Sequence, residues 1–207
     1  IFFRNMLRRT FNTLPRAVKC ARTTTILAVR KDGDVVLMGD KLVTAGSVSV
    51  KHSALKIRTI SKKDQPDVLV GFAGSVADAF SLLQRLEGKL DEYPGQLLRA
   101  CVELAKAWRS DKYLRRLEAT IVACDPSGIF TVDGMGNVLE GDEGVLAAGS
   151  GGYFAAAAAK ALYDIDGLTA EQICAKAMKV ATQMDIHSNE THDILKVVEG
   201  SKEATSS

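Results

Sequence analysis

Three residues near the start of the main body of the chain could together cleave an amide bond. Thr24 opens the first apolar run, Asp40 follows the second, and Lys56 lies in a later one. A threonine hydroxyl is a poor nucleophile until a base removes its proton. A threonine at a chain terminus carries its own base, because an α-amine has a pKa of about 7.7–8.0. A cation held nearby by a carboxylate would lower the pKa values of both groups. The residue types therefore predict an N-terminal threonine nucleophile, once the preceding residues are removed.

Two glycine-rich segments could stabilise the negative charge that develops in such a reaction. Residues 71–74 read Gly-Phe-Ala-Gly, and residues 149–152 read Gly-Ser-Gly-Gly. Exposed backbone N–H groups in such segments can donate to an oxyanion. Taken singly, a glycine-rich segment before a helix is usually a turn or a general anion-binding helix start, and a threonine at a strand start usually reflects β-propensity. The combined spacing is what indicates catalysis.

Apolar periodicity predicts an α+β fold built from separate runs of strands and helices. Asp-Gly between the first two strands is typical of a tight hairpin. The expected strands are 25–29, 35–38, 43–50, 56–60, 68–72, 120–124, 129–132, 145–148 and 194–198. The expected helices are 76–90, 97–108, 153–163 and 169–184, with Ser75 and Thr169 as N-caps. We expect the inward faces of these helices to include Phe80, Val180 and Met184.

Composition argues against several classes of protein. The chain has 27 basic and 25 acidic residues, and six of the basic ones fall in residues 1–23, so the remainder is mildly acidic. This balance gives no reason to expect a nucleic-acid partner. No apolar stretch approaches the roughly 20 residues that a membrane helix needs. The four cysteines and three histidines show neither the spacing of a zinc site nor that of a disulfide framework.

Several sequence blocks resemble the HslV (ClpQ) family, which comprises the proteolytic partners of the HslU ATPase and is related to proteasome β subunits. The blocks are 24–26, 39–40, 70–74, 77–80, 102–106, 108–109, 114–119 and 149–152. The resemblance implies the four-layer α-β-β-α sandwich of N-terminal nucleophile hydrolases. It also implies a homo-oligomer of two stacked hexameric rings, an HslU-type AAA+ ATPase as partner, and unfolded proteins as substrates.

The resemblance also assigns roles to individual residues by position. Thr24 corresponds to the nucleophile, Lys56 to the catalytic lysine and Asp40 to its carboxylate partner. Ser150 corresponds to the serine near the amine, and Gly74 to the oxyanion glycine. The family further binds a monovalent cation, usually Na⁺, through three backbone carbonyls, and these fall on Thr182, Asp185 and Ser188.

This chain departs from the family pattern at two places. The family usually has Gly-Asp-Gly-Gln where this chain has Gly39-Asp40-Lys41-Leu42, in a stretch that borders the substrate pocket. The usual Gly, Cys and Thr of the cation site are replaced by Thr182, Asp185 and Ser188. Backbone carbonyls tolerate that replacement, and the charge of Asp185 would favour a cation.

Residues 1–23 have the composition of a mitochondrial transit peptide, since they are arginine-rich, lack acidic residues and contain no secretory h-region. Met6 resembles a natural start, which would make residues 1–5 untranslated upstream sequence. Arg22 lies two residues before Thr24, a spacing that resembles a processing-peptidase site. We therefore expect a matrix protein whose leader is removed, leaving a threonine protease domain over 24–207 that ends in a short flexible tail. A basic arm that stays attached is the alternative.

Two other functions are compatible with the same residues. A catalytically inactive ring subunit would keep its leader, although intact Thr24, Asp40 and Lys56 argue against it. A small-molecule amidase of the same fold would be a monomer or dimer. Beyond the spacing argument, the sequence leaves open whether Thr23 or Thr24 becomes the terminus, and whether the leader is removed by self-cleavage or by another peptidase.

Overall fold

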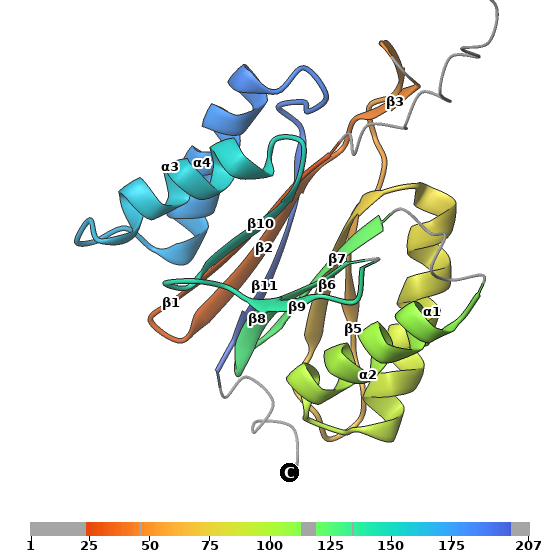
Figure 1. Cartoon of the computed structure of the whole chain (residues 1–207). Coiled ribbons are helices and arrows are strands. Elements are labelled where there is room, and N and C mark those ends of the chain that lie inside the picture. The colour runs from red at the N-terminus through yellow and green to blue at the C-terminus, as the bar shows by residue number, and fades with distance from the viewer. Residues whose placement is uncertain (1–23, 46, 113–118, 134, 200–207) are drawn as a thin grey trace, which may run out of the picture.

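Two antiparallel β-sheets lie face to face, and a pair of helices covers the outer side of each (Figure 1). The computed structural model describes residues 24–45, 47–112, 119–133 and 135–199. The expected leader (1–23), most of the sequence block at 114–119 and the tail from residue 200 lie outside these ranges. Among the described residues, no helix is long and apolar enough to span a membrane.

The first sheet has the strand order β10-β1-β2-β11, and the second has the order β5-β6-β7-β8-β9. The first sheet contains β1 (Thr25–Lys31), β2 (Asp34–Asp40), β10 (Val145–Gly149) and β11 (His192–Val198). The second contains β5 (Ile57–Ile60), β6 (Val68–Gly74), β7 (Ala119–Asp125), β8 (Gly128–Asp133) and β9 (Val138–Glu140). A separate hairpin is formed by β3 (Val43–Ala45) and β4 (Val48–Lys51).

The helices form two pairs, one on each sheet. They are α1 (Val76–Glu92), α2 (Leu97–Ser110), α3 (Gly152–Tyr163) and α4 (Ala170–Met184). Both expected N-caps are confirmed: the Ser75 hydroxyl accepts from the Asp78 N–H at 3.5 Å, and Thr169 forms a complete capping box with Gln172.

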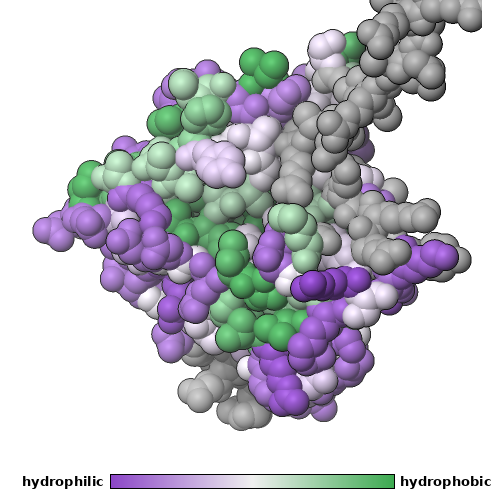
Figure 2. Space-filling model, viewed as in Figure 1, coloured by the Kyte–Doolittle hydropathy of each residue, from purple (hydrophilic) through white to green (hydrophobic). Residues whose placement is uncertain are grey.

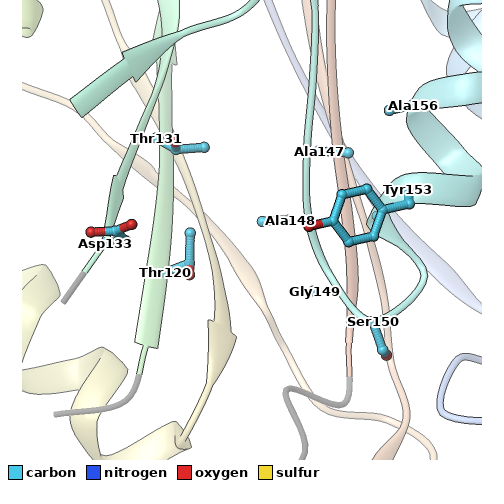
Figure 3. Close-up of a pocket in the computed structure, with 10 residues that line it drawn as sticks. Thr120, Thr131, Asp133, Ala147, Ala148, Gly149, Ser150, Tyr153 and Ala156 are labelled. Carbon is cyan, nitrogen blue, oxygen red and sulfur yellow. The ribbon is translucent and has the colours of Figure 1, made fainter. Parts of the chain in front are cut away.

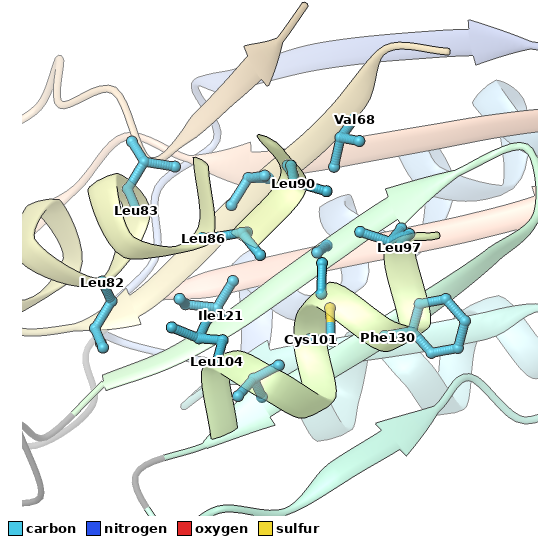
Figure 4. Packing of buried hydrophobic residues seen from close by; sticks show 14 of the residues in the cluster. Val68, Leu82, Leu83, Leu86, Leu90, Leu97, Cys101, Leu104, Ile121 and Phe130 are labelled. Carbon is cyan, nitrogen blue, oxygen red and sulfur yellow. The ribbon is translucent and has the colours of Figure 1, made fainter. Parts of the chain in front are cut away.

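Three apolar clusters separate the four layers. One lies between the sheets and includes Ile26, Leu69 and Val122. A second joins α1 and α2 to the outer face of the second sheet, where leucine side chains of the helices meet strand residues that include Ile121 and Phe130 (Figure 4). A third joins α3 and α4 to the first sheet. Strand β1 shows the alternation that this demands, because Ile26 points to the first cluster and Leu27 to the third. The expected α-β-β-α sandwich is confirmed.

The hairpin between β1 and β2 fixes the register of the strand ends. Asp32 and Gly33 both have positive φ, at 53° and 81°, as a two-residue type I′ turn requires. Lys31 therefore pairs with Asp34, and Ile26 with Gly39. The next residues outward along this ladder are Thr25 and Asp40, which the turn brings together.

Some details differ from the sequence expectations. The single strand expected at 43–50 is wrong, since this segment folds back on itself as β3 and β4. Strand β9 was not expected from the sequence. Phe80, Val180 and Met184 are exposed instead of inward-facing, at 45%, 43% and 61%. For α4 the reason is that small residues on a neighbouring stripe allow the helix to pack closely on the sheet, which turns Val180 and Met184 outward.

Candidate active site

Thr24 directly precedes β1 and is almost fully buried, with 3% of its surface exposed. Its backbone N–H donates to the Ser150 hydroxyl oxygen at 3.3 Å. Its carbonyl oxygen accepts from the backbone N–H of Gly151 at 3.4 Å. The turn between β10 and α3 therefore holds the main chain of Thr24 on both sides of its Cα.

Asp40 and Lys56 form a buried ion pair beside this position. The Asp40 carboxylate is fully buried, and its Oδ1 accepts from Lys56 Nζ at 2.8 Å and from the backbone N–H of Thr25 at 2.8 Å. Its Oδ2 accepts from the Leu42 N–H at 3.0 Å. Burial lowers the pKa of the Lys56 ammonium, while the charge of Asp40 and its hydrogen bond oppose that effect. The structure thus brings together Thr24, Asp40 and Lys56 as the sequence predicted.

A second network runs from the Thr24 nitrogen to the carboxylate of Asp185. The Ser150 hydroxyl, which accepts from Thr24, donates to Asp185 Oδ2 at 2.7 Å. Ser188 donates to the same oxygen at 2.8 Å, so the Thr25 hydroxyl must be the donor in its 2.5 Å contact with Ser188. Asp185 is 7% exposed. Its carboxylate therefore orients both hydroxyl groups that flank the first residues of β1.

The side-chain roles of Asp185 and Ser188 are functional features that the sequence reasoning missed. The sequence predicted both residues as sources of backbone carbonyls and the Asp185 charge as favourable to a cation, but it predicted no hydrogen bonds from their side chains to β1 or to Ser150. An acidic residue three positions before a serine at the end of a helix is too common a pattern to indicate a network. The network can be recognised only in the folded chain, where the loop after α4 lies against the first residues of β1.

The glycines between β10 and α3 are required by close contacts. Gly149 has a φ of +93°, and a Cβ there would collide with the Thr24 carbonyl. A Cβ on Gly151 would collide with the Thr25 hydroxyl and lie 3.0 Å from the Asp185 carboxylate. The Gly-Ser-Gly-Gly segment thus lets β1 approach the turn more closely than any larger residue would permit.

Thr24 opens onto a cavity of about 750 Å³. Lys56, Gly74 and Ser75 also line it, together with apolar side chains that include Leu42 and Phe80. Gly74, predicted as the oxyanion glycine, stands at the end of β6 with a φ of +118°. This cavity is large enough to receive a substrate side chain next to the predicted nucleophile.

A second cavity, of about 610 Å³, lies on the Ser150 side, between β10 of the first sheet and the strands β7 and β8 of the second (Figure 3). Thr120, Thr131 and Asp133 face it from β7 and β8, and Tyr153 faces it from the start of α3. The two cavities therefore flank the Thr24–Ser150 pair, which gives an extended chain room on both sides of it.

The three residues predicted to supply carbonyls to a cation lie at and just after the C-terminal end of α4. Thr182 is in the last turn, Asp185 is the C-cap, and Ser188 follows in the loop. The Asp185 carbonyl accepts from the Ser188 N–H at 3.2 Å. Carbonyls at a helix C-terminus lack intrahelical partners and carry partial negative charge, so this position suits a small cation. Among the described residues, no group of three or more His, Cys, Asp and Glu side chains forms a metal cluster.

A four-layer α-β-β-α sandwich with a threonine at the start of an inner strand, beside a buried lysine, is the arrangement of the threonine-type N-terminal nucleophile hydrolases. The model of the proteasome subunit family matches residues 21–197 of this chain. The ATP-dependent protease subunit HslV of Trypanosoma brucei brucei is 51% identical over 192 residues, which cover 91% of this chain and 90% of that protein. The HslV subunit of Aquifex aeolicus is 52% identical over 169 residues, covering 82% and 94%.

Solved structures agree with these sequence matches. The crystal structure of eukaryotic HslV from Trypanosoma brucei superposes with a TM-score of 0.80 at 52% identity, covering 84% of this chain and 98% of that one. A Thiobacillus denitrificans protein named BPH shares the fold, with a TM-score of 0.66 at 24% identity. The chain therefore belongs to the proteasome family and, within it, to the HslV protease subunits.

Proposed function

We propose that this chain is the threonine endopeptidase subunit of an HslVU-type protease, with Thr24 as its nucleophile. The observation that carries the proposal is the double anchoring of Thr24, by the Ser150–Asp185 network and beside the Asp40–Lys56 pair, at the mouth of a substrate-sized cavity. The relatives named above are described as ATP-dependent protease subunits. Membership of a family of threonine peptidases supports the same activity.

The proposed reaction begins when the Thr24 hydroxyl oxygen attacks the carbonyl carbon of a substrate peptide bond. The free α-amine of Thr24 takes the hydroxyl proton, and the substrate oxygen becomes an oxyanion stabilised by backbone N–H groups near Gly74. The C–N bond then breaks, and the leaving amine takes the proton from the α-ammonium. Water next attacks the ester on Thr24, gives its proton to the same amine, and releases the second product while the hydroxyl is restored.

Lys56 and Ser150 assist this reaction in different ways. The Lys56 ammonium adds positive charge beside the nucleophile, which favours the alkoxide and the neutral amine over their protonated forms. Ser150, oriented by Asp185, accepts a hydrogen bond from the Thr24 nitrogen and thereby directs the lone pair of a free amine toward the hydroxyl. Both roles require the Thr24 nitrogen to be a free amine, whereas in the unprocessed sequence it forms a peptide bond with Thr23.

The proposal therefore includes removal of residues 1–23. The arginine-rich, acid-free composition of that segment supports import into the mitochondrial matrix, where a slightly alkaline pH would favour the neutral amine. We further propose that a monovalent cation, Na⁺ in the first instance, binds the carbonyls of Thr182, Asp185 and Ser188. Such an ion would fix the loop that carries the Asp185 carboxylate.

We also propose that the chain works as two stacked hexameric rings fed by an HslU-type ATPase with unfolded proteins. Large apolar side chains that a monomer would leave in water support an assembly. Tyr153 is 86% exposed, Ile186 85% and Met135 70%. In the view of Figure 2, apolar side chains also gather over the middle of the molecule, between the two helix pairs.

The proposal is tested by treating the native protein with a peptidyl epoxyketone and identifying the modified peptide by mass spectrometry. This reagent closes a ring with both the hydroxyl and the free amine of a terminal threonine. We expect an adduct on a peptide that begins at Thr24, and none in a Thr24→Ala variant. Absence of any adduct on a chain that keeps residues 6–23 would instead indicate an inactive ring subunit.

A further inference from the structure

Arg58 has no part in the proposed chemistry, although its side chain lines the cavity beside Thr24. It lies in β5, two residues after Lys56, and is exposed. Its guanidinium carbon is 4.9 Å from the centre of the Phe80 ring. Within the described part of the chain, no carboxylate forms a salt bridge with Arg58. The cavity therefore contains a cation that nothing in the described protein neutralises.

Stacking against aromatic rings fixes the position of this charge. Phe80 projects from α1 and remains 45% exposed, which is unusual for a phenylalanine on a core helix. Its ring centre is 6.3 Å from that of Phe72, which is buried in β6. A guanidinium over an aromatic face is held there by the ring quadrupole. Phe72 thus supports Phe80, and Phe80 supports Arg58, on one wall of the cavity.

The remaining lining gives the cavity a positive charge. Its basic residues are Lys51, Lys56 and Arg58, and no acidic residue is among the described residues that line it. Asp40 neutralises Lys56 at 2.8 Å, whereas Arg58 and Lys51 have no such partner among the described residues. Most of the other walls are apolar, including Leu42 and Phe80. A side chain that enters meets an apolar surface with a positive wall.

We propose that Arg58 determines the specificity of cleavage, by excluding basic substrate side chains from this cavity and admitting acidic as well as apolar ones. The inference rests on the proposed function, because it assumes that the substrate residue before the cleaved bond occupies the cavity next to Thr24. Two unit charges about 6 Å apart change binding by roughly 3- to 100-fold for effective dielectric constants of about 80 to 20. This range is large enough to decide which bond is cut.

The experiment is a competition among three peptides that differ only in the residue before the cleaved bond, which is Leu, Glu or Lys. The processed protein, with its ATPase and ATP, is offered all three together, and the products are quantified by mass spectrometry. Ratios between products do not depend on the fraction of active enzyme. The variants are Arg58→Glu and, as matched control, Arg99→Glu. Arg99 also stacks on an aromatic ring, with its guanidinium carbon 4.5 Å from the centre of Tyr93, but it lies on α2 and does not line this cavity.

For the unmodified protein we expect the Lys peptide to be cut at least about tenfold more slowly than the Leu peptide. Because Arg58→Glu reverses the charge and so counts the single-charge effect twice, it should raise the Lys-to-Leu ratio and lower the Glu-to-Leu ratio, each by at least about tenfold, while Arg99→Glu leaves both unchanged. If the Leu peptide is cut normally and Arg58→Glu changes neither ratio by more than about twofold, the inference is overturned and the proposed function stands. If none of the three peptides is cut, the proposed function fails and the inference fails with it.

Discussion

Replacing Asp40 with asparagine should reduce both the stability and the activity of this protein, because a buried ammonium then loses its counter-charge. The carboxylate is fully buried and accepts from three donors, the Lys56 ammonium and the backbone N–H groups of Thr25 and Leu42. An asparagine of the same shape offers one acceptor oxygen in place of two. At least one of these donors must therefore lose its hydrogen bond.

Removal of one partner from a buried ion pair costs about 3–5 kcal/mol. Leaving one buried N–H without a partner costs about 1–3 kcal/mol. The two costs overlap, since a single rotation of the amide decides which donor is lost, so we expect a total of about 3–5 kcal/mol. Lys56 limits this penalty by losing its proton, because burial has already lowered its pKa and Asp40 was the main group opposing that effect.

The loss of stability in the Asp40→Asn variant should become smaller as the pH rises. Between the lowered pKa of Lys56 in the folded protein and the ordinary value of about 10.4, the unfolded chain binds more protons, so stability rises with pH. In the Asp40→Asn variant the folded pKa falls further, and this window therefore begins at a lower pH. The difference in stability from the unmodified protein should shrink as the pH rises from 7 toward 10.

The assay is urea unfolding followed by circular dichroism, at one protein concentration because assembly contributes to stability. Lys56→Met and the double variant complete a cycle. The double variant should lose less than the sum of the single losses, by about 2 kcal/mol or more. Additivity within about 0.5 kcal/mol, or a penalty that does not change with pH, would refute the buried ion pair as the cause.

Three further substitutions test other parts of the site and fold. Gly151→Ala should reduce the rate of peptide cleavage by more than about 10²-fold while the protein still folds, because the new methyl group displaces the Thr25 hydroxyl and the Asp185 carboxylate. Cleavage near the normal rate would show that this contact is unimportant. Asp185→Asn should lower kcat by about 10- to 100-fold and leave KM unchanged, because it weakens hydrogen bonds to a charged group. A rise in KM alone would contradict a role for Asp185 in orienting Ser150. Gly88→Ala should stabilise the protein by about 0.5–1 kcal/mol, seen as a higher Tm, because this exposed position in α1 has open space around it; a lower Tm would mean that another surface contacts it.

Much of the fold could be predicted because its signals are local. The Asp-Gly turn, the serine and threonine caps and the short apolar runs each act within a few residues, and the structure contains the turn, both caps and every expected strand except 43–50. The segment 43–50 was predicted wrongly because apolar alternation does not distinguish one strand from a short exposed hairpin. Strand β9 has only three residues, too few for a periodic signal.

The sequence by itself determined the position of Asp40 relative to Thr24. A two-residue turn allows only one register, so the ends of β1 and β2 meet wherever the rest of the chain folds. The sequence also indicated the kind of chemistry, since a threonine, a lysine and a carboxylate have few roles that they can perform together.

Only the tertiary structure decided which of the remaining residues complete the site. Ser150 reaches Thr24 because β10 pairs with β1, and Lys56 reaches Asp40 because β5, which follows it, packs face to face against β2 and β11 of the first sheet. Asp185 joins through a loop after α4, and Arg58 faces the cavity because Phe80 turns outward. Such contacts join residues up to 163 positions apart, as for Thr25 and Ser188. Their geometry depends on how whole layers pack, which no local pattern specifies.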